Sequence, residues 1–74
     1  MCATDIVELR KLMVEKGIIT ISKLSEVSNV NRNTLSEVLN GDKQPSYTVM
    51  CKLKKALDLD GAKAGSIFFK EKLT

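Results

Sequence analysis

Two short amphipathic segments separated by a polar turn, within residues 20–41, most constrain what this chain can fold into. In the first segment Leu24 and Val27 lie three residues apart, and in the second Leu35 and Val38 do the same. If each segment is helical, this spacing gives it one apolar side. The stretch therefore predicts two short helices that pack against the rest of the chain through those sides.

The turn at residues 28–30 suits a sharp change of direction. Asn29 can adopt the positive φ that such a turn requires, because Asn tolerates the left-handed region better than most residues. Asn31 can cap the second helix by accepting from its first free N–H groups, and Gly41 provides a glycine-type end. Two helices, a short turn and a polar start to the second helix predict a helix-turn-helix.

Four stretches follow one another in a recognisable order: LRKLMVEKG, KLSEVSNVNRNTLSEVLNG, then Pro45-Ser46, and KLKKALDL. They lie within residues 6–59, and this part of the chain resembles the Cro and lambda-repressor family of helix-turn-helix proteins. The resemblance implies an all-α fold. It also implies a compact five-helix bundle whose third helix enters the major groove of DNA.

Caps and breaks predict where the five helices begin and end. We expect Thr4, Thr20, Asn31 and Ser46 to cap the first four, since such side chains accept hydrogen bonds at helix starts. The expected helices cover about residues 5–16, 21–28, 32–39, 47–57 and 62–73.

Apolar residues in these helices predict the core. The first helix is expected to contribute Ile6, Leu9, Leu12, Met13 and Val14, and the fourth Val49, Met50, Leu53, Ala56 and Leu57. In the link after the first helix, Ile19 is expected in the core, whereas the direction of Ile18 stays open. Ile67-Phe68-Phe69 either closes the bundle or forms a dimer interface, and closure is favoured.

With 74 residues, the chain has room for one domain with a modest core, so residues 1–74 are expected to form a single helix-turn-helix domain. A hydrophobic content of 43% with few aromatic residues suits a small aliphatic helical bundle. No apolar run approaches a membrane span, and the start lacks the pattern of a secretion signal. Cys2 and Cys51 lack the spacing of metal ligands, and free cytosolic thiols are favoured over a disulfide.

The formal net charge of +3 is unevenly distributed. Residues 1–19 carry three basic and three acidic side chains, and residues 20–45 again carry three of each. The excess lies in residues 46–74, with six basic and three acidic side chains. A positive charge favours a nucleic acid partner, but the expected DNA-reading unit is itself neutral.

Catalysis is not expected from this sequence. The chain has no His, no glycine-rich phosphate loop, no nucleophile elbow and no recognisable motif of paired acids. We therefore expect no enzyme activity, no cofactor and no metal site.

The start of the third helix is the candidate DNA-reading element. Under the resemblance, the helix N-cap and the residues one, two and six positions after it face the base edges. These residues are Asn31, Arg32, Asn33 and Glu37. Arginine can form a bidentate contact with guanine, and asparagine can form one with adenine. The candidates for phosphate contacts are Thr34, Asn40 and Lys43.

Three residues depart from the family pattern at this face. Ile21 stands where the resemblance implies a Gln that contacts phosphate, and Asp42 stands where a basic residue often meets the backbone. Glu37 presents a carboxylate that can accept only from cytosine N4 and otherwise repels phosphate. Acids at these positions reduce the counterion release that drives DNA binding.

A protein partner is the alternative to DNA. Ile21, Val27 and Leu39 stand where the family usually exposes polar side chains, so they are either buried by small helix rotations or form an apolar surface. Together with Glu37 they are the candidates for a protein interface. This pattern resembles, more weakly, the modulator-of-repression proteins of temperate phages, which oppose the main repressor by pairing with it.

The sequence thus predicts a small cytoplasmic transcriptional regulator of phage or bacterial origin. Two functions stay open. One is operator binding through Arg32 and Asn33, and the other is antirepression by docking of the same face on a repressor protein. A homodimer through the C-terminal helix is compatible with the first.

Overall fold

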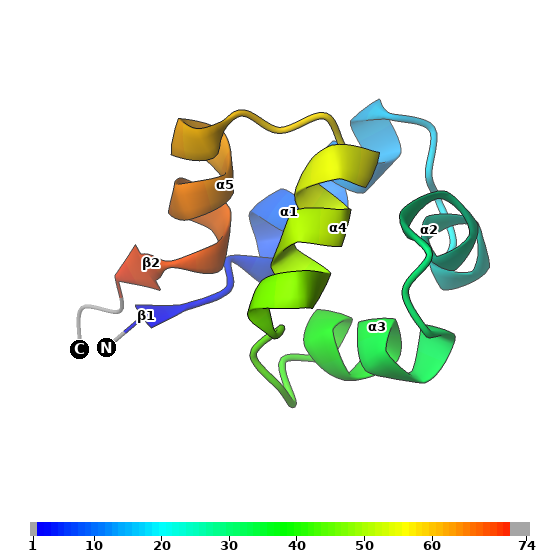
Figure 1. The fold of residues 1–74 in the computed structure, drawn as a ribbon, viewed down its shortest axis with the longest axis horizontal. Coiled ribbons are helices and arrows are strands. Elements are labelled where there is room, and N and C mark those ends of the chain that lie inside the picture. The colour runs from blue at the N-terminus through cyan, green and yellow to red at the C-terminus, as the bar shows by residue number, and fades with distance from the viewer. Residues whose placement is uncertain (1, 72–74) are drawn as a thin grey trace.

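Five helices form the body of the protein, and a short antiparallel strand pair joins the two ends of the chain (Figure 1). The computed structural model describes residues 2–71, and the side chains of residues 3–70. The elements are β1 (Cys2–Ala3), α1 (Ile6–Glu15), α2 (Ile21–Ser28), α3 (Arg32–Leu39), α4 (Tyr47–Ala56), α5 (Gly61–Phe68) and β2 (Lys70–Glu71). The expected all-α, five-helix bundle is confirmed, and the strand pair is an addition that the sequence did not indicate.

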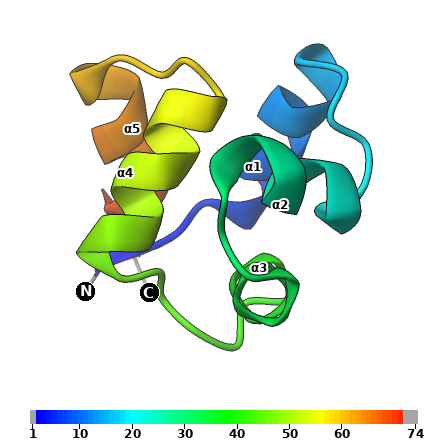
Figure 2. The ribbon, with the colours of Figure 1, turned by 45° about the vertical axis from the view of Figure 1, so that its right-hand side comes forward.

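One hydrophobic core holds the helices together. α2 packs against α3 and α4, and α1 packs against α3 and α5 (Figure 1, Figure 2). At the centre lie side chains without exposed surface: Leu9, Leu24, Leu35, Leu53, Leu57 and Ile67. Burying each such side chain stabilises the fold by roughly 1.5–3 kcal/mol. The core therefore fixes the helix-turn-helix against the other three helices.

The turn between α2 and α3 has the backbone expected of Asn29. This residue lies in the left-handed region, with φ 59° and ψ 36°, and its N–H donates to the Ser25 carbonyl at 2.8 Å. The Ser25 hydroxyl in turn donates to the Val30 carbonyl at 2.6 Å. Thr20 caps α2 and Asn31 caps α3, which confirms both predicted starts.

The end of α1 decides which of two neighbouring isoleucines is buried. Gly17 has φ 74°, its N–H donates to the Val14 carbonyl, and the Ile18 N–H donates to the Met13 carbonyl. These are the hydrogen bonds of a Schellman motif, in which the residue after the glycine turns back onto the helix. Ile18 is accordingly 5% exposed and Ile19 77% exposed, so the prediction of Ile19 in the core was wrong. Val14 was also expected in the core, but it lies on the solvent side of α1.

α1 begins at Ile6, one residue later than expected for a helix capped by Thr4. Its N-cap is Asp5, whose carboxylate accepts from the Glu8 N–H at 3.2 Å. Thr4 instead donates through its N–H and its hydroxyl to the side-chain oxygen of Gln44, at 3.1 and 2.9 Å. The prediction of Thr4 as the N-cap was wrong because Gln44, forty residues away, engages it.

α4 follows its prediction. The Ser46 hydroxyl caps the helix by accepting from the Val49 N–H at 3.3 Å. Leu53 and Leu57 are fully buried, and the other apolar residues of the expected stripe are partly buried. Cys51 is a free, exposed thiol. The side chain of Cys2 lies outside the described side chains.

α5 is shorter than expected, since it ends at Phe68 rather than near residue 73. The chain leaves the helix because Lys70–Glu71 pairs with Cys2–Ala3 in antiparallel register. Ile67 and Phe68 are buried, in agreement with the favoured closure of the core, but Phe69 is 56% exposed. Residues 72 and 73 of the expected helix lie outside the described residues.

Candidate nucleic-acid interface

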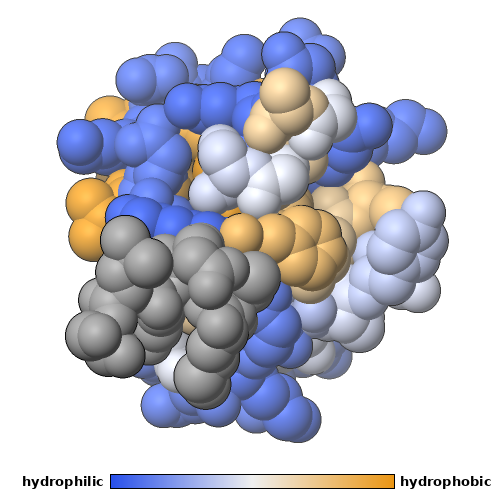
Figure 3. Space-filling model, turned by 90° about the vertical axis from the view of Figure 1, so that its left-hand side faces the viewer, coloured by the Kyte–Doolittle hydropathy of each residue, from blue (hydrophilic) through white to orange (hydrophobic). Residues whose placement is uncertain are grey.

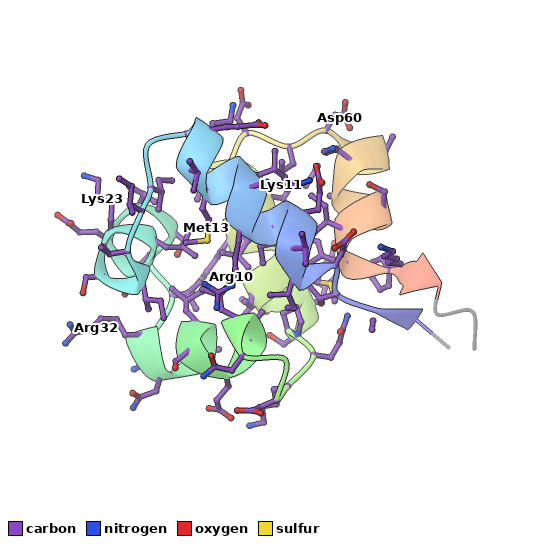
Figure 4. The ribbon with its side chains drawn as sticks, turned by 180° about the vertical axis from the view of Figure 1, so that it is seen from behind. Arg10, Lys11, Met13, Lys23, Arg32 and Asp60 are labelled. Carbon is purple, nitrogen blue, oxygen red and sulfur yellow. The ribbon has the colours of Figure 1, made fainter. Side chains whose placement is uncertain are left out.

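The first turn of α3 is exposed and locally well ordered by its cap. The Asn31 side-chain oxygen accepts from the Asn33 N–H at 2.7 Å, so Asn31 holds the start of the helix. Asn31, Arg32 and Asn33 are all exposed, and Figure 4 shows Arg32 extending away from the body of the protein. The structure therefore brings together three of the four expected base-reading residues on one short turn.

Arg32 also reaches the neighbouring helix. Its guanidinium lies 3.3 Å from the hydroxyl of Ser22, near the start of α2. A single exposed hydrogen bond of this length stabilises an orientation weakly, so the guanidinium can leave it for a stronger partner. Ser22 was not among the residues expected at this site, and its only signal in the sequence is its place as the second residue of α2.

Glu37 is the fourth expected base-reading residue. It forms an ion pair with Lys43, which was expected to contact phosphate. Its carboxylate lies 3.5 Å from the Lys43 ammonium, and both side chains are substantially exposed. The N–H groups of Asp42 and Lys43 also donate to the Glu37 carbonyl, at 2.9 and 3.3 Å. The loop after α3 is thus folded back onto the helix, with one positive and one negative charge in contact.

The two remaining phosphate candidates lie on α3 or at its end. Thr34 is half-buried in the first turn of the helix. Asn40 is the C-cap, and its side-chain amide lies 3.4 Å from the Ser36 hydroxyl on the preceding turn. Asn40 is exposed, whereas Thr34 is only partly accessible.

The proposed apolar interface is only partly present. Leu39 is 2% exposed and belongs to the core, so its selection as an interface residue was wrong. It turns inward because α3 packs against α1, where Arg10 donates to the Leu39 carbonyl at 3.1 Å (Figure 4). Ile21 is half-buried against the core, and Val27 is exposed.

Gln44 positions the loop that follows α3, although no local sequence pattern marks it. Its side-chain oxygen accepts both hydrogen bonds from Thr4, and its amide donates to the Phe68 carbonyl at 2.8 Å. One side chain therefore links the loop beside Lys43 to the start of the chain and to the end of α5.

A family model of the Cro/C1-type HTH (helix-turn-helix) DNA-binding domain matches residues 8–61. The chain belongs to this family. Comparisons with curated proteins and with solved structures give no significant match. The family consists of DNA-binding regulators that are not typically enzymes, and α2 and α3 form the helix-turn-helix of this member.

As a Cro/C1-type domain, the protein carries little net charge around α3. Arg32 is cationic, Glu37 and Lys43 neutralise each other, and Asp42 adds a negative charge. Each Lys or Arg contact to phosphate would add counterion release, and few are available here. Hydrogen bonds from amide side chains and helix N–H groups would therefore carry a larger share of DNA binding.

Among residues 2–71, no cluster of His, Cys, Asp and Glu side chains could hold a metal ion. Within the same residues, every helix is too short or too polar to cross a membrane.

Proposed function

We propose that this protein binds operator DNA through α3 and regulates transcription. The observation that supports this most is the exposed first turn of α3, where Arg32 and Asn33 follow the Asn31 cap. An α-helix fits into the major groove, where arginine recognises guanine O6 and N7 and asparagine recognises adenine N6 and N7. Arg32 and Asn33 would read two base pairs in this way.

Phosphate contacts would hold α3 in the groove. Thr34 and Asn40 can donate hydrogen bonds to phosphate oxygens without a change of fold. Lys43 must first leave Glu37, but an exposed ion pair contributes only about 0–1 kcal/mol, so a phosphate can replace the carboxylate. Glu37 would then accept from a cytosine amine or repel the duplex.

DNA binding by Arg32→Ala tests the proposal. Fluorescence anisotropy with duplexes from the protein's own control region should show that Arg32→Ala loses roughly 1–3 kcal/mol of DNA-binding free energy. The variant should also show a relaxed preference at one base pair. Lys11→Ala, which removes an exposed cation from α1, is the matched control and should keep sequence preference intact. If Arg32→Ala retains full affinity and full specificity, Arg32 does not read the operator.

Pairing of two copies through α5 belongs to the same proposal, because two-fold operators are read by paired helices one DNA turn apart. Its support is an apolar groove of about 240 Å³ between α4 and α5, which Tyr47, Phe69, Gly61 and Gly65 help to line. Figure 3, which faces the α5 side, shows apolar surface near the centre of that side. Analytical ultracentrifugation of the protein with and without DNA tests this pairing. A complex with only one protein copy per operator would contradict it.

The second proposed function is antirepression, in which the α3 face docks on a repressor protein. The observation that favours it is the low charge of that face together with the exposed Val27 and the half-buried Ile21. Glu37 would imitate a phosphate and pair with a basic residue of the repressor. That residue must displace Lys43, which Glu37 already contacts.

We propose that residues 1–74 act as one domain, since one core contains side chains from all five helices. As an operator-binding regulator of phage or bacterial origin, the protein would act in the cytoplasm of a bacterial host.

A further inference from the structure

Among the described side chains, α4 carries a cluster of three lysines that no carboxylate neutralises, whereas α3 carries one unpaired cation, Arg32. Among the side chains of residues 3–70, three lysines outside α4 form ion pairs with carboxylates: Lys43, Lys63 and Lys70. Within the same part of the chain, the three lysines of α4 form no ion pair: Lys52, Lys54 and Lys55. A cluster of unpaired cations favours a negatively charged partner.

Two of these lysines border a groove of about 350 Å³ between α2 and α4, called here the α2/α4 groove. Its lining residues are Val27, Ser28, Asn29, Lys52, Lys55 and Ala56. The lining contains no carboxylate, and neither Glu26 nor Asp58, the acids nearest in sequence, belongs to it. The α2/α4 groove is therefore a positively charged recess.

The α2/α4 groove combines apolar surface with hydrogen-bond donors. Val27 is 44% exposed, and Ala56 beside it is half-buried. The Lys52 ammonium lies 3.4 Å from the Asn29 carbonyl, which holds it at the end of α2. Lysine ammonium groups donate hydrogen bonds and cannot accept them. A ligand that suits this groove must supply negatively charged acceptors together with an apolar group.

We propose that the α2/α4 groove binds an acidic segment of a partner protein. An aliphatic side chain of that segment packs against Val27, and its carboxylates lie near Lys52 and Lys55. An apolar centre with a charged rim is the usual arrangement of a protein interface. A DNA backbone would match the lysines equally well, but it would place phosphates against the apolar Val27, so the observations favour a protein segment.

This surface does not include the first turn of α3 that is proposed to read DNA, although it shares Val27 with the surface proposed to dock on a repressor. In Figure 1 α3 lies along the lower edge of the molecule, and α4 rises away from it toward the end that carries Lys55. Figure 2 shows α2 and α4 side by side above α3. Binding at the α2/α4 groove therefore does not require α3 to be free, and the inference does not depend on operator binding.

The experiment uses the ¹⁵N-labelled full chain and a synthetic 14-residue peptide with one central Leu flanked by Glu residues. The peptide should shift the amide resonances of Val27, Asn29, Lys52 and Lys55, and its binding should weaken as salt rises. Val27→Ser should weaken binding about tenfold, and Lys55→Gln about threefold. Lys63→Gln, which removes a lysine from α5, is the matched control and should have no effect.

Three comparisons decide between occupants of the α2/α4 groove. A peptide with Ser in place of Leu should bind about tenfold more weakly, because it lacks the apolar anchor. A peptide with Lys in place of each Glu should not bind. Shifts centred on another face, or equal binding of the Leu and Ser peptides, would overturn the proposal. A random-sequence DNA duplex that displaces the peptide from these amides with higher affinity would instead assign the groove to nucleic acid.

Discussion

At the scale of single residues, Glu37 is the side chain on which operator binding and repressor binding differ most. It lies on α3, one and a half turns after Arg32, and is held by Lys43 at 3.5 Å. On DNA the carboxylate would repel the phosphates, and it also pairs with Lys43, which could otherwise neutralise one phosphate. On a repressor the same carboxylate would supply the negative charge that the partner's basic surface requires.

We expect Glu37→Gln to strengthen DNA binding if the protein reads an operator. The change removes a repulsive charge and frees Lys43, so the slope of log affinity against log salt should steepen by about 0.9. If the protein is an antirepressor, Glu37→Gln should weaken its complex with the repressor and leave DNA binding negligible. Lys43→Gln, titrated in parallel, should flatten the salt slope only in the first case. Stronger repressor pairing without any DNA response would contradict both functions.

Asp5 makes the stability of the protein depend on pH in the acidic range. The Glu8 N–H, and then the Lys70 ammonium at 3.1 Å, stabilise the charged carboxylate and hold the pKa of Asp5 below its usual 3.8. Because this pKa is lowered on folding, the stabilisation is full above pH 3.8 and is lost as pH falls through the folded pKa. Urea denaturation measures the free energy of unfolding at pH 7 and at pH 3. The decrease in this free energy between pH 7 and pH 3 should be smaller for Asp5→Asn than for the parent protein. Asp5→Asn keeps an N-cap acceptor, whereas Asp5→Ala should cost about 0.5–2 kcal/mol at either pH.

At the scale of elements, local chemistry was sufficient wherever a cap or a turn depends on neighbouring residues. Asn29 supplied the left-handed turn, and Thr20, Asn31 and Ser46 capped the helices expected of them. Ile19 lies outside the core, contrary to expectation, because the Schellman motif at the end of α1 turns Ile18 inward instead. Gly17 followed by an apolar residue was the signal that could have placed Ile18 in the core.

Leu35 tests the packing of α3 on α2. This side chain has no exposed surface and belongs to the same core as Leu24. Leu35→Ala should lower the free energy of unfolding by about 2–5 kcal/mol, because it removes buried methyl groups and leaves a cavity. Thermal melts measure the effect, and Val27→Ala on the exposed side of α2 is the control. Equal melting of Leu35→Ala and the parent would mean that α3 faces the core with another side.

At the scale of the whole molecule, the sequence could predict the bundle but not the contacts that join distant segments. The resemblance to the Cro and lambda-repressor family implied five helices around one core, and caps and apolar residues indicated where each helix lies. The pairing of β1 with β2 and the hydrogen bonds of Gln44 link residues that are far apart in sequence, and no local pattern marks them. The charge of α4 was visible in the sequence, but its place beside Val27 required the packing of α2 on α4.

Gln44 is the residue through which the loop beside α3 depends on both ends of the chain. Gln44→Ala removes two hydrogen bonds from Thr4 and one to the Phe68 carbonyl. Each contributes about 0.5–1.5 kcal/mol when buried and less when exposed, so we expect a loss of roughly 1–3 kcal/mol in unfolding free energy. In a domain of this size each kcal/mol lost lowers the melting temperature by about 4–8 °C. Hydrogen exchange should accelerate first at the Thr4 N–H, which loses its acceptor, and then across the strand pair. Lys43→Ala changes the neighbouring side chain without touching these bonds and should leave exchange at Thr4 unaltered. Unchanged melting and unchanged exchange in Gln44→Ala would show that the core alone holds the loop and the chain ends in place.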